Sequence, residues 1–181
     1  MKIIESDFEY KEYRCVIIFH DGGFRCGYVG LPKGHPLYGK DYNDKLKATF
    51  EEILDQPFGK RNPFQMLLFT FNNNQPEDEV QLGLYFDVHG GITYSDGGDN
   101  STHPIESSLW WLGFDCGHAG DDKDWELVEK LWGDEPVVQR RLEYEKEIHF
   151  EGDVLRTLEY VQQECKNLVD QIIDYCERYE G

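Results

Sequence analysis

The chain has 181 residues and a formal net charge of −18, with 36 Asp and Glu against 18 Lys and Arg. Its 39% hydrophobic and 14% aromatic content excludes a disordered acidic tail, and its length is typical of one domain, which we place over residues 1–181. No apolar run reaches the roughly 18 residues of a membrane span, and an acidic surface disfavours direct binding to duplex DNA because phosphates repel it. The N-terminus lacks a signal-peptide core and the five cysteines contain no CxxC pair, so we expect free thiols and a cytoplasmic protein.

The first predicted element is a β-hairpin over residues 13–29, where β-branched and aromatic residues flank Asp21–Gly22. That dipeptide is typical of a two-residue type I′ turn. Such a turn pairs Cys15 with Tyr28, and the two-residue period of a strand places Cys26 on the same apolar face. The two cysteines would then be neighbours in a core and not a disulfide.

The middle of the chain predicts one helix and then several strands. The helix is expected over residues 44–54, and the strands over residues 64–71, 80–88, 91–94 and 108–114.

The last third of the chain is predicted to be helical. A short helix is expected over residues 124–132, capped by Asp121 or Asp122. A long amphipathic helix is expected over residues 153–179, with Asp153 as its N-cap, because apolar residues recur there every three to four positions. The predicted fold class is therefore α+β, a twisted antiparallel sheet packed against a long C-terminal amphipathic helix.

Two glycine-containing segments, residues 87–95 and 110–122, are richer in polar side chains than packing requires. Each follows an expected strand and enters a turn, where side chains can converge on a cleft. Their candidate metal ligands are His89, Asp115, Cys116, His118 and Asp121.

Nitrogen, oxygen and sulfur donors of this kind fit a zinc site or a mixed hydrolytic site. With a coordination position left open, bound water would be the nucleophile of a metal-dependent hydrolase, and Asp115 or Asp121 its base. The spacing matches no standard ligand motif, since HExxH, CxxC and HxH are absent. The alternative is a hydrogen-bonded network that only orients the turns, with no cofactor.

The negative charge is concentrated in one part of the sequence. Residues 76–135 hold fifteen acidic and only two basic side chains, whereas residues 1–60 hold ten acidic and nine basic ones. Such a block either keeps the protein in solution or binds a positively charged partner.

The motifs HGGITYS (residues 89–95) and WWLGFDCGHAGD (residues 110–121) resemble those of a family of small proteins from phages and prophages of Gram-positive bacteria. The helical RTLEYVQQECKNLVDQI (residues 156–172) is similar to the C-terminal segment of the same family. In length and acidity the chain also resembles the type II-A anti-CRISPR proteins, which inhibit Cas9.

This resemblance implies a phage-encoded anti-defence inhibitor, and not an enzyme, in the cytoplasm of a bacterial host. Its partner would be a basic protein or ribonucleoprotein such as Cas9, which holds nucleic acid in basic channels. The acids expected to contact that partner are Asp121, Asp122, Asp124, Glu126 and Glu129. The alternative is that these acids cap and solubilise the helix that they begin.

Overall fold

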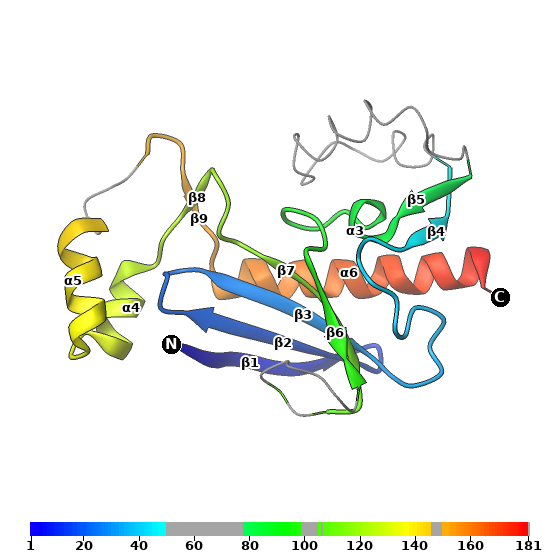
Figure 1. Ribbon diagram of the computed structural model, residues 1–181, viewed down its shortest axis with the longest axis horizontal. Coiled ribbons are helices and arrows are strands. Elements are labelled where there is room, and N and C mark those ends of the chain that lie inside the picture. Colours follow the sequence, from blue (N-terminus) through cyan, green and yellow to red (C-terminus); the bar gives the residue numbers. More distant parts are fainter. Residues whose placement is uncertain (50–77, 99–104, 106, 146–149, 181) are drawn as a thin grey trace.

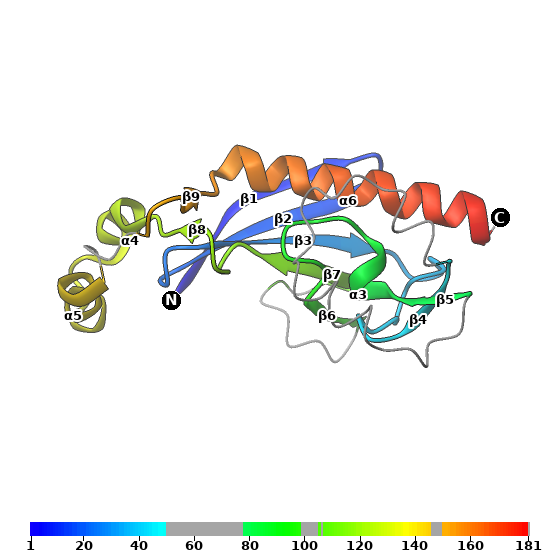
Figure 2. The same cartoon turned by 90° about the horizontal axis from the view of Figure 1, so that it is seen from above.

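The computed structural model describes residues 1–49, 78–98, 105, 107–145 and 150–180. Its centre is a five-stranded antiparallel sheet in the order β1-β2-β3-β7-β6, with the long helix α6 lying along one face (Figures 1 and 2). This arrangement confirms the α+β class. These elements are β1 (Lys2–Tyr10), β2 (Tyr13–His20), β3 (Arg25–Leu31), β6 (Tyr94–Gly97), β7 (Trp110–Asp115) and α6 (Leu158–Tyr179).

Smaller elements lie beyond the two ends of the sheet (Figure 1). At one end are β4 (Lys45–Lys47), β5 (Glu79–Gln81) and the single turn α3 (Leu82–Tyr85). At the other end are β8 (Asp121–Asp122), α4 (Trp125–Trp132), α5 (Pro136–Glu145) and β9 (Val154–Leu155). The strands β8 and β9 form a short parallel pair.

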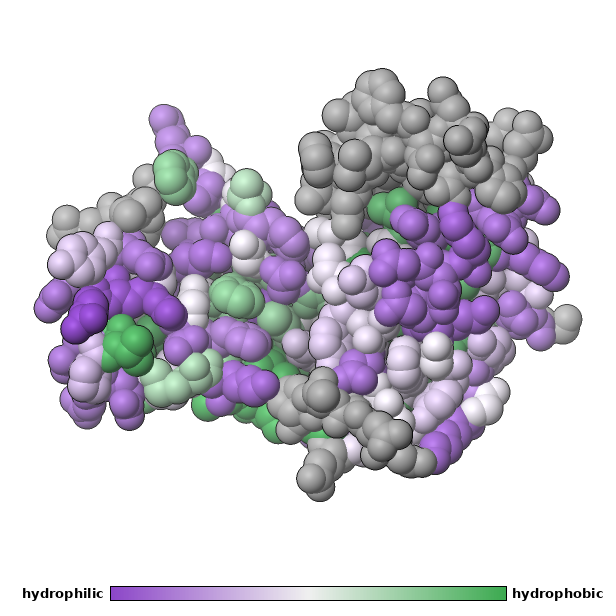
Figure 3. Space-filling view, in the orientation of Figure 1, coloured by the Kyte–Doolittle hydropathy of each residue, from purple (hydrophilic) through white to green (hydrophobic). Residues whose placement is uncertain are grey.

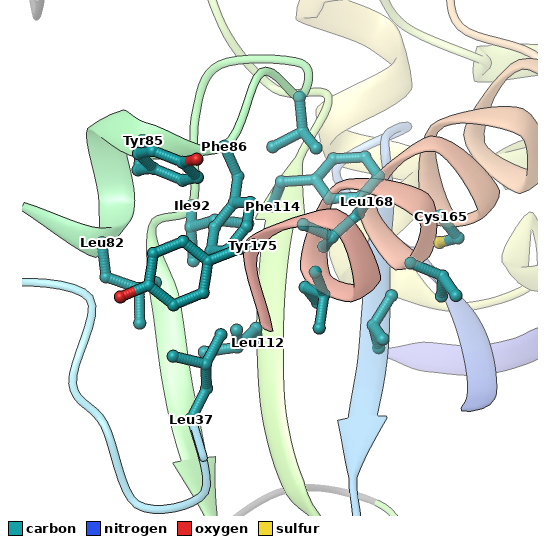
Figure 4. Close-up of a cluster of buried hydrophobic side chains, with 14 of the residues drawn as sticks. Leu37, Leu82, Tyr85, Phe86, Ile92, Leu112, Phe114, Cys165, Leu168 and Tyr175 are labelled. Carbon is teal, nitrogen blue, oxygen red and sulfur yellow. The ribbon is translucent and has the colours of Figure 1, made fainter. Parts of the chain in front are cut away.

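The main core lies between the sheet and α6. Apolar residues of α6 at helical spacing, among them Leu168, Ile172 and Tyr175, are at most 1% exposed. The ring of Tyr175 packs edge-on against Tyr85, at 5.1 Å between centroids, among the side chains that Figure 4 shows. The periodicity that predicts the helix is thus the periodicity of its buried face.

The register of the β2–β3 hairpin differs from the prediction by one residue. Gly23, and not Gly22, takes the positive φ, at 79°, and the connection is a three-residue loop closed between His20 and Phe24. Cys15 therefore pairs with Val29 and not with Tyr28.

A slip of one residue moves each side chain of a strand to the other face of the sheet. Cys15 accordingly packs in the core beneath α6, whereas Cys26 and Tyr28 pack in a second cluster with Val16 and Trp111. The predicted contact between the two cysteines is therefore wrong, although both thiols are free and buried as expected.

A two-residue turn with two positive φ angles does occur one hairpin earlier, between β1 and β2. Its central residues, Lys11 and Glu12, have φ values of 48° and 70°. The register of β1 against β2 also shifts once, between Ile4 and Ser6, which marks an irregularity in this edge strand.

Several other predictions need correction. Residues 45–47 form strand β4, so the helix expected over residues 44–54 does not begin there, and residues 50–54 and the strand expected at 64–71 lie outside the described residues. The strand expected at 80–88 ends at Gln81, since residues 82–85 form α3, and the strand expected at 91–94 instead begins at Tyr94. The helix α5 was not predicted.

Both predicted N-caps are also displaced. The cap of α4 is Asp124, whose side chain accepts a hydrogen bond from the backbone N–H of Leu127, in place of Asp121 or Asp122. Thr157 caps α6 in the same way, and residues 154–155, expected to be helical, form strand β9. The chain is extended there because β9 pairs with β8.

A buried arginine joins the sheet to the α4 end of the molecule. Arg25 is 5% exposed, and its guanidinium donates to Glu5 Oε2 at 2.7 Å and to Asp124 Oδ2 at 2.9 Å. Glu5 accepts a second bond, of 2.9 Å at Oε1, and a further bond, of 3.2 Å, goes to the backbone carbonyl of Arg156. One side chain therefore ties together β1, the N-cap of α4 and the segment that precedes α6.

We expect Arg25→Met to lower the free energy of unfolding by about 3–5 kcal/mol, because it leaves two partly buried carboxylates without their cation. The matched control is Arg14→Met, which breaks the more exposed pair with Asp7 and should cost less than about 1 kcal/mol. Urea unfolding followed by circular dichroism measures both. Equal losses in the two variants would contradict the role assigned to Arg25.

Candidate metal centre

Three of the predicted ligands come together at one end of the sheet. His89, His118 and Asp121 each offer a ligand atom, and these atoms all lie within 4.8 Å of one another. His89 follows α3, His118 lies in the turn between β7 and β8, and Asp121 is the first residue of β8. The two segments that the sequence singles out therefore do meet in space.

The turn of residues 118–121 places His118 beside Asp121. The backbone N–H of Asp121 donates to the carbonyl of His118 at 3.1 Å, and the N–H of His118 donates back to Asp121 Oδ2 at 3.0 Å. Pairing of β8 with β9 then holds Asp121 opposite Val154. The turn and the strand pairing together fix the positions of two of the three candidate ligands.

The loop after α3 brings His89 to this turn. The backbone N–H of His89 donates to the buried carboxylate of Glu164, in α6, at 3.0 Å. The next residue, Gly90, has φ +69°, and a Cβ atom there would lie 2.4 Å from Cε1 of His118. Only glycine therefore lets the loop pass this close to the His118 ring.

Both ring nitrogens of His89 have partners. Nε2 lies 2.8 Å from Asp121 Oδ2, and Nδ1 lies 3.0 Å from the hydroxyl of Tyr160. A carboxylate can only accept a hydrogen bond, so a neutral His89 carries its proton on Nε2 and accepts from Tyr160 at Nδ1. Burial, followed by the charge of Glu164, raises the pKa of Tyr160 to about 12, so its hydroxyl keeps its proton at neutral pH.

The carboxylate of Asp121 is the most deeply buried group of the site, with its side chain 1% exposed. Its second oxygen, Oδ1, accepts from Arg156 Nε at 2.8 Å. Burial alone would raise the pKa of Asp121, but hydrogen bonds from His89 and Arg156 outweigh it and lower the pKa to about 2. Asp121 is therefore a carboxylate at every physiological pH.

The ring of His118 differs from that of His89, because its buried nitrogen is left without a hydrogen bond. Its Nδ1 is buried and makes no hydrogen bond to any residue in the described part of the chain. The nearest carboxylate oxygens lie at 3.7 Å, on Asp115, and at 3.9 Å, on Asp121, beyond hydrogen-bond length. The rest of its side chain is 29% exposed, so the group opens toward solvent on this side.

The two other predicted ligands are not part of the group. Cys116 is 1% exposed in the core beneath α6, and burial together with the charge of Asp121 raises the pKa of its thiol. Asp115 lies beside the group, with its carboxylate accepting from the N–H of Gly117 at 3.0 Å. Neighbours on a strand point to opposite faces, which separates these two side chains.

Arg156, Tyr160 and Glu164 complete the site and were not predicted. They lie just before and within the first turns of α6, spaced four residues apart. Glu164 could have been found from the sequence, because it lies between Val161 and Cys165 on the apolar side of the helix. Carboxylates are almost never fully buried unless they have a partner, so an acid at that position indicates an interaction. Nothing in the sequence marked Arg156.

The five acids expected to contact a partner do not form one surface. Asp121 is buried in the site, and the carboxylate of Asp124 is used by Arg25 and the α4 cap. Glu126 and Glu129 are exposed and Asp122 is half-buried. Figure 3 shows hydrophilic side chains at both ends of the visible face and not in a single patch.

No family model matches this chain, and searches of curated proteins and of solved structures return no significant match. Within the described residues, every helix is too short or too polar to cross a membrane. The case for a function therefore depends on the geometry of the site.

The low pKa of Asp121 predicts a pH dependence of stability in the metal-free protein. Since the folded pKa of about 2 is below the ordinary value of 3.8, the stabilisation is complete above that value and is lost as the pH falls toward 2. The loss amounts to about 2 kcal/mol. We expect it in the wild type but not in Asp121→Asn, by urea unfolding between pH 5 and pH 2 in the presence of a chelator.

The control is Asp134→Asn, at an exposed position after α4, which should leave the pH dependence of the wild type unchanged. If Asp121→Asn kept the wild-type pH dependence, the buried carboxylate would not be its source.

Proposed function

We propose that His89, His118 and Asp121 bind a divalent metal ion, with Zn²⁺ as the preferred ion, and that the protein is a metal-dependent hydrolase. The observation that carries this proposal is the unpaired, buried Nδ1 of His118, 3.9 Å from an oxygen of Asp121. A buried polar atom without a partner costs about 1–3 kcal/mol, and an ion bound at this nitrogen would recover that cost.

The donor set fits zinc. Two imidazole nitrogens and one carboxylate oxygen are the ligands of many catalytic zinc sites, which keep the fourth position for water. Zinc bonds of about 2.0–2.1 Å in a tetrahedron separate ligand atoms by roughly 3.3 Å. The His89–Asp121 pair at 2.8 Å must therefore open, and the His118–Asp121 pair at 3.9 Å must close, each by about half an ångström.

The groups around the ligands suit metal binding as well. With an ion held at Nε2, a neutral His89 would carry its ring proton on Nδ1 and would donate it to the hydroxyl of Tyr160. Such an outer partner fixes the ring and makes the bound nitrogen a better ligand. Arg156 holds the free oxygen of Asp121 in the same way.

Hydrolysis needs a nucleophile, a base and access for the substrate. The fourth position would hold a water whose pKa the ion lowers, on the side where His118 is exposed. Asp115, with Oδ1 3.7 Å from His118 Nδ1, lies beside that position and would accept the proton of the attacking water. As the oxygen of water bonds to the acyl or phosphoryl centre and the substrate's bond to its leaving group breaks, Asp115 would return the proton to that leaving group.

Zinc titration of the chelator-treated full chain tests the proposal. We expect one tightly bound zinc ion per chain, and a loss of affinity of more than about 100-fold in His118→Ala, since even outer partners of a metal site are worth 10–100-fold. Substitution with Co²⁺ should give the intense visible bands of a four-coordinate ion.

The control is His35→Gln, at a histidine whose ring contacts Tyr13 and Cys176 instead, which should bind zinc as the wild type does. Unfolding curves without metal establish that each variant is folded. A wild-type chain without stoichiometric zinc, or equal zinc affinity in His118→Ala, would refute the metal centre.

The anti-defence function remains a second proposal, supported by the acids of α4. Glu126 and Glu129 are exposed, lie three residues apart on one side of that helix, and are close in sequence to Leu131, which is 37% exposed. Acidic groups beside an apolar anchor suit a basic protein or ribonucleoprotein such as Cas9, because charge speeds the encounter and apolar contact prolongs it.

Reversing both charges tests this second proposal. The double variant Glu126→Lys, Glu129→Lys should weaken capture of a Cas9–guide RNA complex at low salt by about tenfold or more. The matched control reverses Glu143 and Glu145, which are exposed on α5. No capture by the wild type, or equal losses in both double variants, would exclude α4 as the binding surface.

A further inference from the structure

We infer that the substrate of this site carries a phosphate group, and that Arg156 binds it beside the metal ion. The inference rests on the proposed metal centre and names the class of substrate that the centre would act on. It starts from an arginine that is held firmly in place but uses few of its hydrogen-bond donors.

Arg156 is fixed at three points. It follows β9, whose pairing with β8 sets the position of its backbone, and its carbonyl accepts from Arg25 at 3.2 Å. Its guanidinium stacks on the ring of Tyr160, 5.1 Å from the centroid. Its Nε donates to Asp121 Oδ1 at 2.8 Å. The side chain therefore has little freedom left to lose when a ligand binds.

The two terminal nitrogens of this guanidinium have no partner among the described residues, and the side chain remains 25% exposed. They carry four of the five N–H donors of an arginine. If Arg156 served only to neutralise Asp121, we would expect two of its nitrogens to donate to the two carboxylate oxygens of Asp121. Arg14 binds Asp7 in this way. The second oxygen of Asp121 instead faces His89, so the N–H groups on the two terminal nitrogens of Arg156 are left for another acceptor.

The carboxylate of Asp121 sets the distance between the proposed metal ion and the guanidinium of Arg156. Oδ2 faces the metal position and Oδ1 faces Arg156, so the ion and the guanidinium lie at the two oxygens of one carboxylate. A tetrahedral phosphate can place one oxygen on the ion and others on the guanidinium at the same time. This pairing of a divalent ion with an arginine stabilises the charge of a phosphoryl group during transfer to water.

A planar carboxylate can bring one oxygen to the ion and the other to the guanidinium, but it has no third oxygen for a two-point contact with the guanidinium fork. An uncharged ester or amide lacks the negative charge that favours binding to the ion and to Arg156. Of these three chemical classes, only a phosphate ester has oxygens for the metal position and for both terminal nitrogens of Arg156.

The test is calorimetric titration of inorganic phosphate into the zinc-loaded full chain after free metal has been removed. We expect one phosphate to bind per chain, and its affinity to fall about tenfold or more in Arg156→Gln, the loss typical of charge-assisted hydrogen bonds. Because Arg156 also holds Asp121, we expect a weaker zinc site in this variant, so the zinc content of both proteins is measured first and the phosphate affinity is given per zinc-loaded chain. Arg140→Gln, at an exposed arginine of α5, is the matched control and should bind phosphate normally.

The outcomes separate the two proposals. Three results would overturn the assignment of the substrate class and leave the metal centre standing. Zinc could bind without phosphate, acetate could bind as tightly as phosphate, or Arg156→Gln could bind phosphate as the wild type does. If the wild type holds no zinc, both proposals fail. Phosphate binding that requires both zinc and Arg156 supports the inference.

Discussion

The buried carboxylate of Asp121 is the interaction on which the organisation of this end of the molecule depends. A charge removed from water must be compensated by partners, and Asp121 obtains them from three separate parts of the chain. Its neighbours are the loop after α3 through His89, its own turn through the backbone of His118, and the segment before α6 through Arg156. The electrostatic demand of one group thus fixes how these three segments approach one another.

The same demand makes the site suitable for a cation. Asp121 is ionised, His89 is oriented by Tyr160 on its far side, and the His118 ring lies against Gly90, where a larger residue has no room. Asp121 and His89 are thus each oriented by a hydrogen bond from outside the three-residue group, from Arg156 and Tyr160 respectively. The nearby cluster of Arg25 with Glu5 and Asp124 differs, because all three guanidinium nitrogens of Arg25 donate hydrogen bonds.

Much of the fold could be predicted from local patterns. The periodic apolar residues of α6 and the alternating strands around residues 13–31 are strong signals, and both elements exist. The register of the hairpin was missed because a three-residue loop ending at Gly23 replaced the two-residue turn that Asp21–Gly22 favours. The strand β9 was read as helix because its pairing with β8, more than thirty positions earlier in the chain, has no local signature.

The residues of the site likewise divide into those that local sequence patterns predict and those that they do not. His89, His118 and Asp121 were recognised because each stands in a polar, glycine-containing turn after an expected strand. Arg156 and Tyr160 were not, since an arginine before a helix and a tyrosine in its first turn are common on ordinary surfaces. Cys116 was included because it is adjacent to the other candidates, yet the alternation of the strand directs it into the core. The sequence thus identifies the segments that come together in space. Which of their side chains meet depends on the alternation of side chains along the strand.

The irregular edge strand β1 has a consequence for assembly. An exposed strand edge is a template on which another chain can add itself, and long flat edges lead to fibres. Here the shift between Ile4 and Ser6 breaks the regular spacing of backbone donors and acceptors, and the strand carries Glu5, Asp7 and Glu9. An incoming copy would meet a mismatched ladder, while the opposite edge, β6, offers only four residues. The sheet is therefore protected against growing by strand addition at either border.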